Sequence, residues 1–179
     1  MALKSKDKIY FDTDCLSSFL MVDNIGILIN LYGKKCKISS FVAMEFRKIK
    51  SINKKLLDCQ NKGFFEIEDF NLKSKEANLF MLLIKGDHKH PKIGHGEASA
   101  ITLAYYNQAT MASNNLKDIS YYIEFYNIHN LTVADILYEA VSQNVIIKAE
   151  AEKIWQDMRN LNRRLPCNTY EEWLNKKQK

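Results

Sequence analysis

The amino-acid sequence predicts an α/β fold built on a central parallel sheet. Short runs of β-branched and aromatic residues alternate along the chain with helical segments of about ten residues or more. This alternation is typical of right-handed βαβ units, whose strands pair in parallel. The chain has 179 residues, of which 46% are hydrophobic and 26% charged, enough for one globular domain with a short appendage.

The composition excludes several other classes of protein. Two prolines and six glycines exclude collagen-like chains, and no apolar run approaches the roughly 20 residues of a membrane-spanning helix. The first residues lead directly into a strand without the apolar segment of a signal peptide, so we expect a cytoplasmic protein with no membrane partner. The net charge of +5 permits a polyanionic partner without requiring one. The four cysteines do not have the spacing of a zinc site, and we expect them to be reduced thiols: Cys15, Cys36, Cys59 and Cys167.

The first half of the chain contains three predicted strands, each followed by helical sequence. Gly33 and Gly63 mark helix stops, and Ser39 or Ser40 can cap a helix that carries Phe41, Met44 and Ile49. Strands are predicted at residues 8–11, 36–39 and 64–67, and further helices at 16–20, 25–31, 52–59 and 72–84.

The second half repeats the pattern after a polar loop between Gly86 and Gly96. Thr132 and Asp135 form a capping box at the start of one helix. Strands are predicted at residues 109–112 and 128–131, and helices at 97–105, 116–125, 133–141, 148–165 and 170–174. We divide the chain into a domain of residues 1–147 and a C-terminal helical extension of residues 148–179.

Polar side chains follow two of the predicted strands where each strand ends. Asp12 and Asp14 follow the first strand, and Ser113, Asn114 and Asn115 follow the fourth. Because the loops that leave the carboxyl ends of parallel strands form the binding site of an open α/β sheet, we expect the chemistry here.

Two further carboxylates stand in apolar surroundings. Glu45 is in line with Phe41 and Ile49 on its helix, and Glu97 opens a helix of small residues. Glu97 suits the positive end of a helix, and Glu45 could lie at the margin of its apolar stripe. Together with Asp12, however, they would repel one another unless a cation compensates them, and carboxylate oxygens select Mg²⁺ or Mn²⁺.

Three segments resemble the PIN-domain family in order and spacing: KIYFDTDCLSS at 8–18, SSFVAMEFRKI at 39–49 and GHGEASAITLA at 94–104. In that family an acid follows the first strand, a Glu lies on the helix after the second, and a GE-x-x-A-I helix supplies another acid. The resemblance covers about residues 8–145 and implies a three-layer α/β/α fold. It assigns the family's acidic positions to Asp12, Glu45 and Glu97.

The fourth acidic position departs from the family pattern, because Asn115 or Asn114 stands where an Asp is typical. Asp118, three residues later, could restore a carboxylate. The resemblance thus implies five catalytic residues: Asp12, Glu45, Glu97, Asn115 and Asp118. All of them except Glu45 would be metal ligands. Glu45 would orient or deprotonate the attacking water.

The implied activity is that of a metal-dependent endoribonuclease, the VapC-like toxin of a toxin–antitoxin pair. RNA, an antitoxin protein and a second copy of the chain are the implied partners. In-line attack by water would leave a 5′-phosphate and a 3′-hydroxyl. RNA binding at an acidic centre requires a basic rim, for which the candidates are Lys34, Lys35, Lys37, Arg47, Lys48, Lys50, Lys54 and Lys55.

Two alternatives remain open. One is a catalytically weak or inactive PIN-like module that binds RNA or protein, since an Asn brings no charge to the fourth position. The other is a haloacid dehalogenase-like phosphatase, because Asp12-Thr13-Asp14 resembles that family's D-x-D opening, but its later paired acids are missing.

Four further features have both a functional and a structural interpretation. Thr13 and Ser17 could contact phosphate or cap a helix, and the stripe from Ala151 to Leu165 suits core packing or a docked partner. Catalytic roles are also conceivable for His88, His90 and His95.

Overall fold

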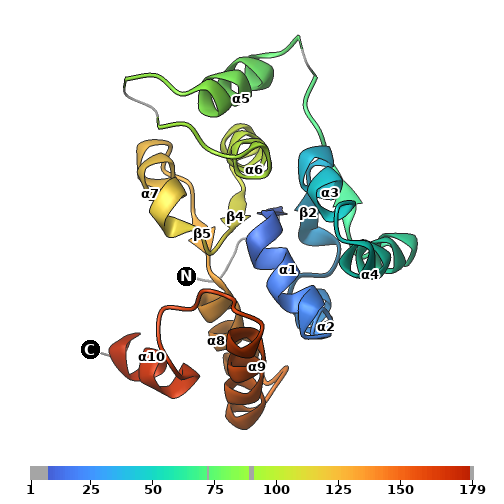
Figure 1. Ribbon diagram of the computed structural model, residues 1–179, viewed down its shortest axis with the longest axis vertical. Helices are drawn as coiled ribbons and strands as arrows, with labels where there is room; N and C mark the ends of the chain where they lie inside the picture. The colour runs from blue at the N-terminus through green and yellow to red at the C-terminus, as the bar shows by residue number, and fades with distance from the viewer. Residues whose placement is uncertain (1–7, 72, 89–90, 178–179) are drawn as a thin grey trace.

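The computed structural model describes residues 8–71, 73–88 and 91–177 of the chain (Figure 1). In this part, five parallel strands form one sheet in the order β3-β2-β1-β4-β5. The strands are β1 (Ile9–Phe11), β2 (Cys36–Ile38), β3 (Glu66–Ile67), β4 (Thr110–Ala112) and β5 (Asn130–Leu131).

Strand β1 lies in the middle of the sheet. Its Ile9 is opposite Cys36 of β2 on one side and Thr110 of β4 on the other. All three residues of β1 are fully buried, because helices cover both faces of the sheet and a parallel strand then has no polar face.

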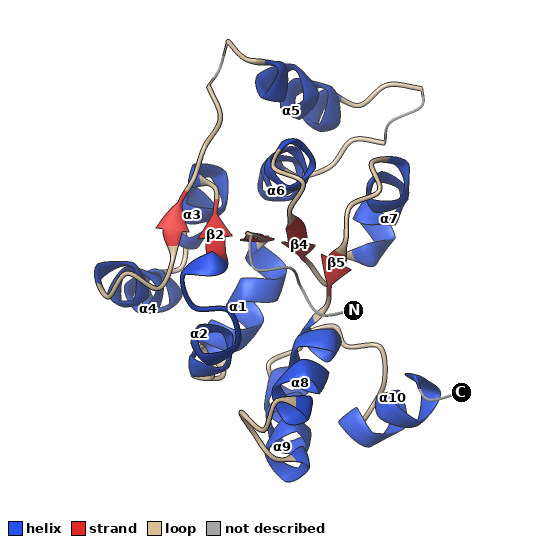
Figure 2. Ribbon diagram, turned by 180° about the vertical axis from the view of Figure 1, so that it is seen from behind, coloured by secondary structure: helices blue, strands red, loops and turns tan. Residues whose placement is uncertain are grey.

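Helices fill the connections between the strands, as both views show (Figures 1 and 2). The helices before β4 are α1 (Thr13–Met21), α2 (Gly26–Tyr32), the 3₁₀ turn η1 (Gly33–Lys35), α3 (Ser40–Phe46), α4 (Lys50–Asn61), α5 (Lys75–Lys85) and α6 (His95–Tyr106). Those after β4 are α7 (Leu116–Phe125), α8 (Val133–Ser142), α9 (Lys148–Asn160) and α10 (Tyr170–Lys177).

The buried side chains form two clusters, one on each face of the sheet. Ile9 and Phe11 point into a cluster with residues from α1, α2, α4, α8 and α9, whereas Tyr10 between them points into a cluster with α5, α6 and α7. In Figure 2 the strands accordingly form a row between two groups of helices. The predicted three-layer α/β/α fold is confirmed.

Two predicted helices end earlier than the sequence pattern indicates. The helix with Phe41 and Met44 ends at Phe46, and Ile49 is extended and 52% exposed before α4. The helix predicted over 148–165 ends at Asn160, because Asn162 adopts a left-handed backbone with φ 57°. The predicted start of α5 at Leu72 lies outside the described residues, and the helix there begins at Lys75.

The C-terminal helices share the core of the rest of the molecule. Trp155 and Met158 of α9 are fully buried in the same cluster as Leu16 of α1. The boundary after residue 147 therefore stays a prediction about folding units rather than a visible gap in the packing. Within the described residues, no helix has the length and apolarity to cross a membrane.

Candidate active site

The site lies where the chain changes direction in the sheet. From β1 the chain builds the sheet outward through β2 and β3, and then returns to place β4 on the other side of β1. The carboxyl ends of β1 and β4 are tied together, since the Asp12 amide donates to the Ala112 carbonyl at 3.0 Å. Such a switch point is the usual place for a binding site in an open α/β sheet. As predicted, the polar residues after both strands lie at this edge.

Asp12 is the most deeply placed acid of the site. It caps the N-terminus of α1, and its Oδ1 accepts from the Cys15 amide at 2.7 Å. Asp12 is only 1% exposed, and its Oδ2 is buried without a hydrogen-bond partner among the described residues. Burial raises the pKa of Asp12 to about 7, although the nearby Ser113 hydroxyl and the Cys15 amide oppose the shift.

Glu97 serves its own helix and the site together. It stands in the first turn of α6, where the positive end of the helix favours a carboxylate. Its Oε2 accepts from the Gly94 amide at 3.1 Å, and its Oε1 accepts from Asn115 Nδ2 at 2.5 Å. The capping contact of Glu97 is thus compatible with the site role expected for it, since its other oxygen faces Asn115.

Asn115 joins two carboxylates through one nitrogen. Its Nδ2 donates to Glu97 and also to Asp118 Oδ2, at 2.7 Å. Asp118 is exposed in the first turn of α7, on the same edge. Asn114 instead faces α8, where its Oδ1 accepts from the Val133 amide at 2.8 Å. Of the two asparagines, the structure brings Asn115 to the acids.

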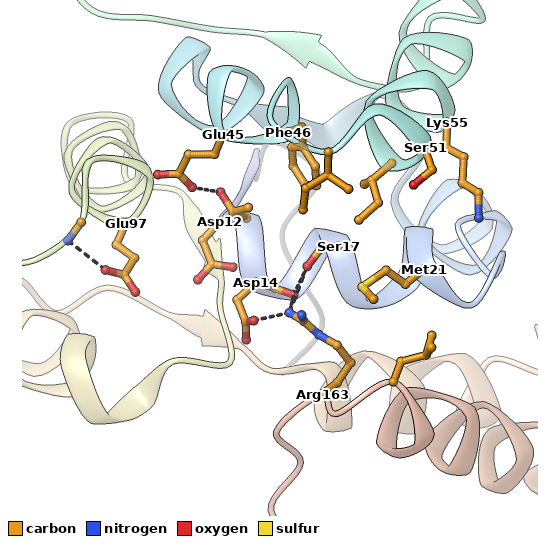
Figure 3. A pocket seen from close by; sticks show the side chains of 15 residues that line it. Asp12, Asp14, Ser17, Met21, Glu45, Phe46, Ser51, Lys55, Glu97 and Arg163 are labelled. Atoms are coloured by element: carbon orange, nitrogen blue, oxygen red, sulfur yellow. Dashed lines mark hydrogen bonds and ion pairs between the residues drawn. The ribbon is translucent and has the colours of Figure 1, made fainter.

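Glu45 is held by donors from two other helices. The Thr13 hydroxyl of α1 donates to its Oε2, and the Gly96 amide of α6 donates to its Oε1 at 3.2 Å. A Cβ on Gly96 would lie 2.8 Å from Oε2, so the glycine leaves room for the Glu45 carboxylate in its present position. Glu45 thus lies beside Asp12 and Glu97 rather than at the margin of an apolar stripe (Figure 3).

A pocket of about 670 Å³ opens from these acids along α1 (Figure 3). Asp12, Glu45 and Glu97 line one end, and Lys55 of α4 lines it further along. The remaining lining residues are Thr13, Asp14, Ser17, Met21, Phe46, Ile49, Ser51, Ile52, Gly94, Leu161 and Arg163. We call Asp12, Glu45, Glu97, Asn115 and Asp118 the acidic site.

Sequence reasoning missed Arg163. It follows α9 in the chain, and its Nη2 pairs with the Asp14 carboxylate and donates to Ser17 Oγ at 3.0 Å. The helical stripe continues through Leu161 and Leu165, so the periodicity places this segment on a helix. An Asn at position 162, just where a helix can end in a left-handed turn, was the available signal.

The other sequence candidates lie at several places. His95 begins α6, stacks on Phe41 with 6.2 Å between ring centroids, and does not line the pocket. His88 is exposed, and His90 lies outside the described residues. Lys37, predicted in the basic rim, is instead buried in β2 and paired with Glu66, because its strand lies inside the sheet.

The acidic site suits a hard divalent cation in its chemistry. Its donors are carboxylate and amide oxygens, which Mg²⁺ and Mn²⁺ prefer. The buried Oδ2 of Asp12 has no hydrogen-bond partner among the described residues, and a bound cation would supply one. In the part of the chain that is described, no three His, Cys, Asp or Glu side chains are already drawn together as a metal site. Instead, the Asn115 amide occupies the position between Glu97 and Asp118.

Comparison with known proteins agrees with the fold. A family model for the PIN domain matches residues 8–179. No curated protein matches the chain.

Proposed function

Since the chain belongs to the PIN-domain family and has its nuclease fold, we propose that it is a metal-dependent endoribonuclease. The observation that carries this proposal is the Asp12 carboxyl group, which is buried beside Glu97 and whose Oδ2 has no hydrogen-bond partner among the described residues. A carboxylate in this position is stable only if it is protonated or compensated by a cation.

Four residues would hold Mg²⁺ or Mn²⁺: Asp12, Glu97, Asn115 and Asp118. A bound ion of this kind supplies an activated water and polarises the scissile phosphate. The residues themselves fix the geometry. Asp12 is locked by its cap on α1 and Glu97 by its cap on α6, so neither carboxylate can rotate freely.

Glu45 would orient the attacking water and accept its proton. Its carboxylate accepts from Thr13 and Gly96, and a carboxylate has about four lone-pair sites, so acceptor capacity remains. The two donors come from α1 and α6, which carry Asp12 and Glu97. These two hydrogen bonds therefore position the Glu45 carboxylate relative to those acids.

The proposed substrate is RNA, cut by water to leave a 5′-phosphate and a 3′-hydroxyl. We also propose the finer assignment of a VapC-like toxin whose partners are an antitoxin protein and a second copy of the chain. A reducing compartment such as the cytoplasm fits the four cysteines, all of which are free and buried.

The test is incubation of the purified chain with labelled single-stranded RNA in Mn²⁺ or in EDTA. We expect cleavage only with Mn²⁺, and its loss in Asp12→Asn. The control is Asp58→Asn, which makes the same change at an exposed position of α4. Cleavage that persists in EDTA or in Asp12→Asn would contradict the proposal.

A non-catalytic RNA-binding module is the second candidate, and the Asn115 contacts favour it. The Asn115 amide lies between Glu97 and Asp118, where its two N–H donors bridge the two carboxylates without a metal. If this is the function, the wild-type chain binds RNA without cutting it, and Asn115→Asp gains Mn²⁺-dependent cleavage. If the chain is an active nuclease, the wild type already cuts. Membership of the PIN family favours both the nuclease and the RNA-binding module over a phosphatase.

A further inference from the structure

The pocket continues along α1 beyond Asp12, Glu45 and Glu97, and its other lining residues have a different chemistry (Figure 3). Two cations, Lys55 of α4 and Arg163 after α9, line it together with apolar side chains. Arg163 lies beside Asp14 near the acids, whereas Lys55 lies beside the Leu20 carbonyl toward the other end of α1. We call these two residues the pocket cations. Hydrolysis at the acids makes no use of them, so their presence calls for a separate explanation.

Arg163 is fixed in place before any ligand arrives. Its Nη2 pairs with Asp14 and bonds Ser17, and its Nε donates to Ser18 Oγ at 3.2 Å. Its side chain is only 19% exposed. Among the described residues its Nη1 makes no hydrogen bond, which leaves two N–H donors of a guanidinium held at the pocket wall. A preorganised guanidinium is well suited to bind phosphate.

Lys55 supplies a second cation further along the pocket. Its Nζ is 2.6 Å from Asp23 Oδ1 and 3.0 Å from the Leu20 carbonyl. The Asp23 side chain is 77% exposed, so this pair is a weak surface ion pair. A phosphate can therefore compete for Lys55.

The wall of the pocket is apolar. Phe46 and Ile52 are buried beneath it, Met21 is half-buried, and Leu161 is 42% exposed at the rim. The pocket volume of about 670 Å³ lies within the range of small-ligand sites. Apolar side chains beside cations suit a nucleobase next to its phosphate, and such a base must be free of duplex pairing.

We propose that the pocket cations and the apolar wall form a subsite for the nucleotide that flanks the scissile phosphodiester of single-stranded RNA. This inference rests on the proposed nuclease function. Arg163 and Lys55 contact backbone phosphates, while Met21, Ile52 and Leu161 contact the base. The C-terminal segment after α9 thereby contributes directly to substrate binding.

Two exposed cations provide controls for the two pocket cations. Lys55→Ala and Arg163→Ala remove pocket cations, whereas Lys62→Ala, at the C-terminal end of α4, and Arg164→Ala remove exposed cations that do not line the pocket. Leu161→Asp places a negative charge on the wall, and its control is Leu57→Asp on α4, where Leu57 is 47% exposed.

The experiment measures binding of a fluorescein-labelled single-stranded RNA to each variant in the Asp12→Asn background, and KM for cleavage in the active chain. We expect Lys55→Ala and Arg163→Ala to weaken binding and raise KM about tenfold, the effect of losing a charged hydrogen bond. Leu161→Asp should weaken binding and raise KM because its carboxylate repels the RNA phosphates. The controls should change binding about twofold or less. The slope of binding against salt should fall by about 0.7 for each lost phosphate contact.

The outcomes separate this inference from the nuclease proposal. If the wild type cleaves RNA but the pocket variants match their controls, the subsite proposal is wrong and the nuclease proposal is kept. The pocket would then be a candidate site for a protein partner instead. If Arg163→Ala fails to fold because Asp14 loses its partner, Lys55→Ala and Leu161→Asp decide. A chain that neither cleaves nor binds RNA overturns both.

Discussion

At the scale of single residues, Asp12 combines burial with an unpartnered oxygen. Burial raises the pKa of its carboxyl group from about 3.8 to about 7, so the folded protein favours the protonated form. A group whose pKa is higher in the folded state stabilises the fold below its unfolded pKa, and this stabilisation is lost as the pH rises through the folded pKa. The contribution of Asp12 to the stability of the metal-free folded protein is therefore least favourable at alkaline pH.

Without metal, we expect the melting temperature to rise as the pH is lowered from about 8 to about 6. Asp12→Asn should flatten this dependence and raise the melting temperature at about pH 8, because Asn keeps the cap on α1 without a charge. Thermal unfolding in EDTA across this range is the measurement, with Asp58→Asn as control. An unchanged pH dependence in Asp12→Asn would show that other groups cause it.

Gly96 allows a second residue-scale prediction. A Cβ there would lie 2.8 Å from Glu45 Oε2, the mobile end of a side chain, and Gly96 has no positive φ. Gly96→Ala should therefore leave the free energy of unfolding within about 1 kcal/mol of the wild type. By displacing Glu45 it should lower the cleavage rate by up to about 100-fold.

Cleavage kinetics and urea unfolding of the same preparation check this expectation. The control is Gly26→Ala, since a Cβ on Gly26 meets no heavy atom within 4 Å. Full activity in Gly96→Ala would mean that the position of Glu45 does not limit the reaction.

At the scale of elements, the sequence predicts the acids at the strand ends well because local rules decide them. A buried strand that stops at Asp12 and a helix with Glu97 in its first turn each follow from patterns a few residues long. The partners of those acids come from far along the chain. Thr13 and Glu45 are 32 positions apart, and Arg163 and Asp14 are 149 apart, so no local pattern shows these contacts.

The end of α9 shows how a correct periodicity can mislead. The apolar stripe continues through Leu161 and Leu165, yet the helix ends at Asn160 and Leu161 is 42% exposed. Asn tolerates the left-handed conformation better than most residues, and at position 162 it turns the chain back toward α1. One residue therefore decides whether Arg163 reaches the pocket.

Asn162→Ala should lower the free energy of unfolding by about 1 kcal/mol and weaken RNA binding, whereas Asn162→Gly should keep both. Asn144→Ala, at an equal φ of 57° after α8, should cost similar stability without affecting RNA binding. Urea unfolding and RNA titration of the three variants test this. Equal RNA binding in Asn162→Ala and wild type would argue against the role of this turn.

At the scale of the whole molecule, we propose that residues 148–177 stabilise the nuclease domain from outside its sheet. Trp155 and Met158 are fully buried in the cluster that contains Leu16 and Phe11. Each such side chain contributes about 1.5–3 kcal/mol when buried. Their sum of about 3–6 kcal/mol is a large share of the roughly 5–15 kcal/mol that stabilises an ordinary domain.

A chain ending at residue 147 should therefore show no cooperative unfolding transition, because it loses these side chains and the Arg163–Asp14 ion pair. Circular dichroism during urea titration is the measurement, with the full chain as reference. A sharp transition in the shortened chain, together with stabilisation by Mn²⁺, would show that residues 1–147 fold alone.

The contact between Arg163 and Asp14 has a consequence for the order of events during protein synthesis. The ribosome delivers Asp14 early and Arg163 only after another 148 residues have been joined, the two being 149 positions apart. A growing chain that already carries every residue of the acidic site still lacks α9, Leu161 and Arg163. If the protein is the proposed ribonuclease, the growing chain therefore does not cleave the messenger RNA from which it is translated until nearly all of its residues have been joined.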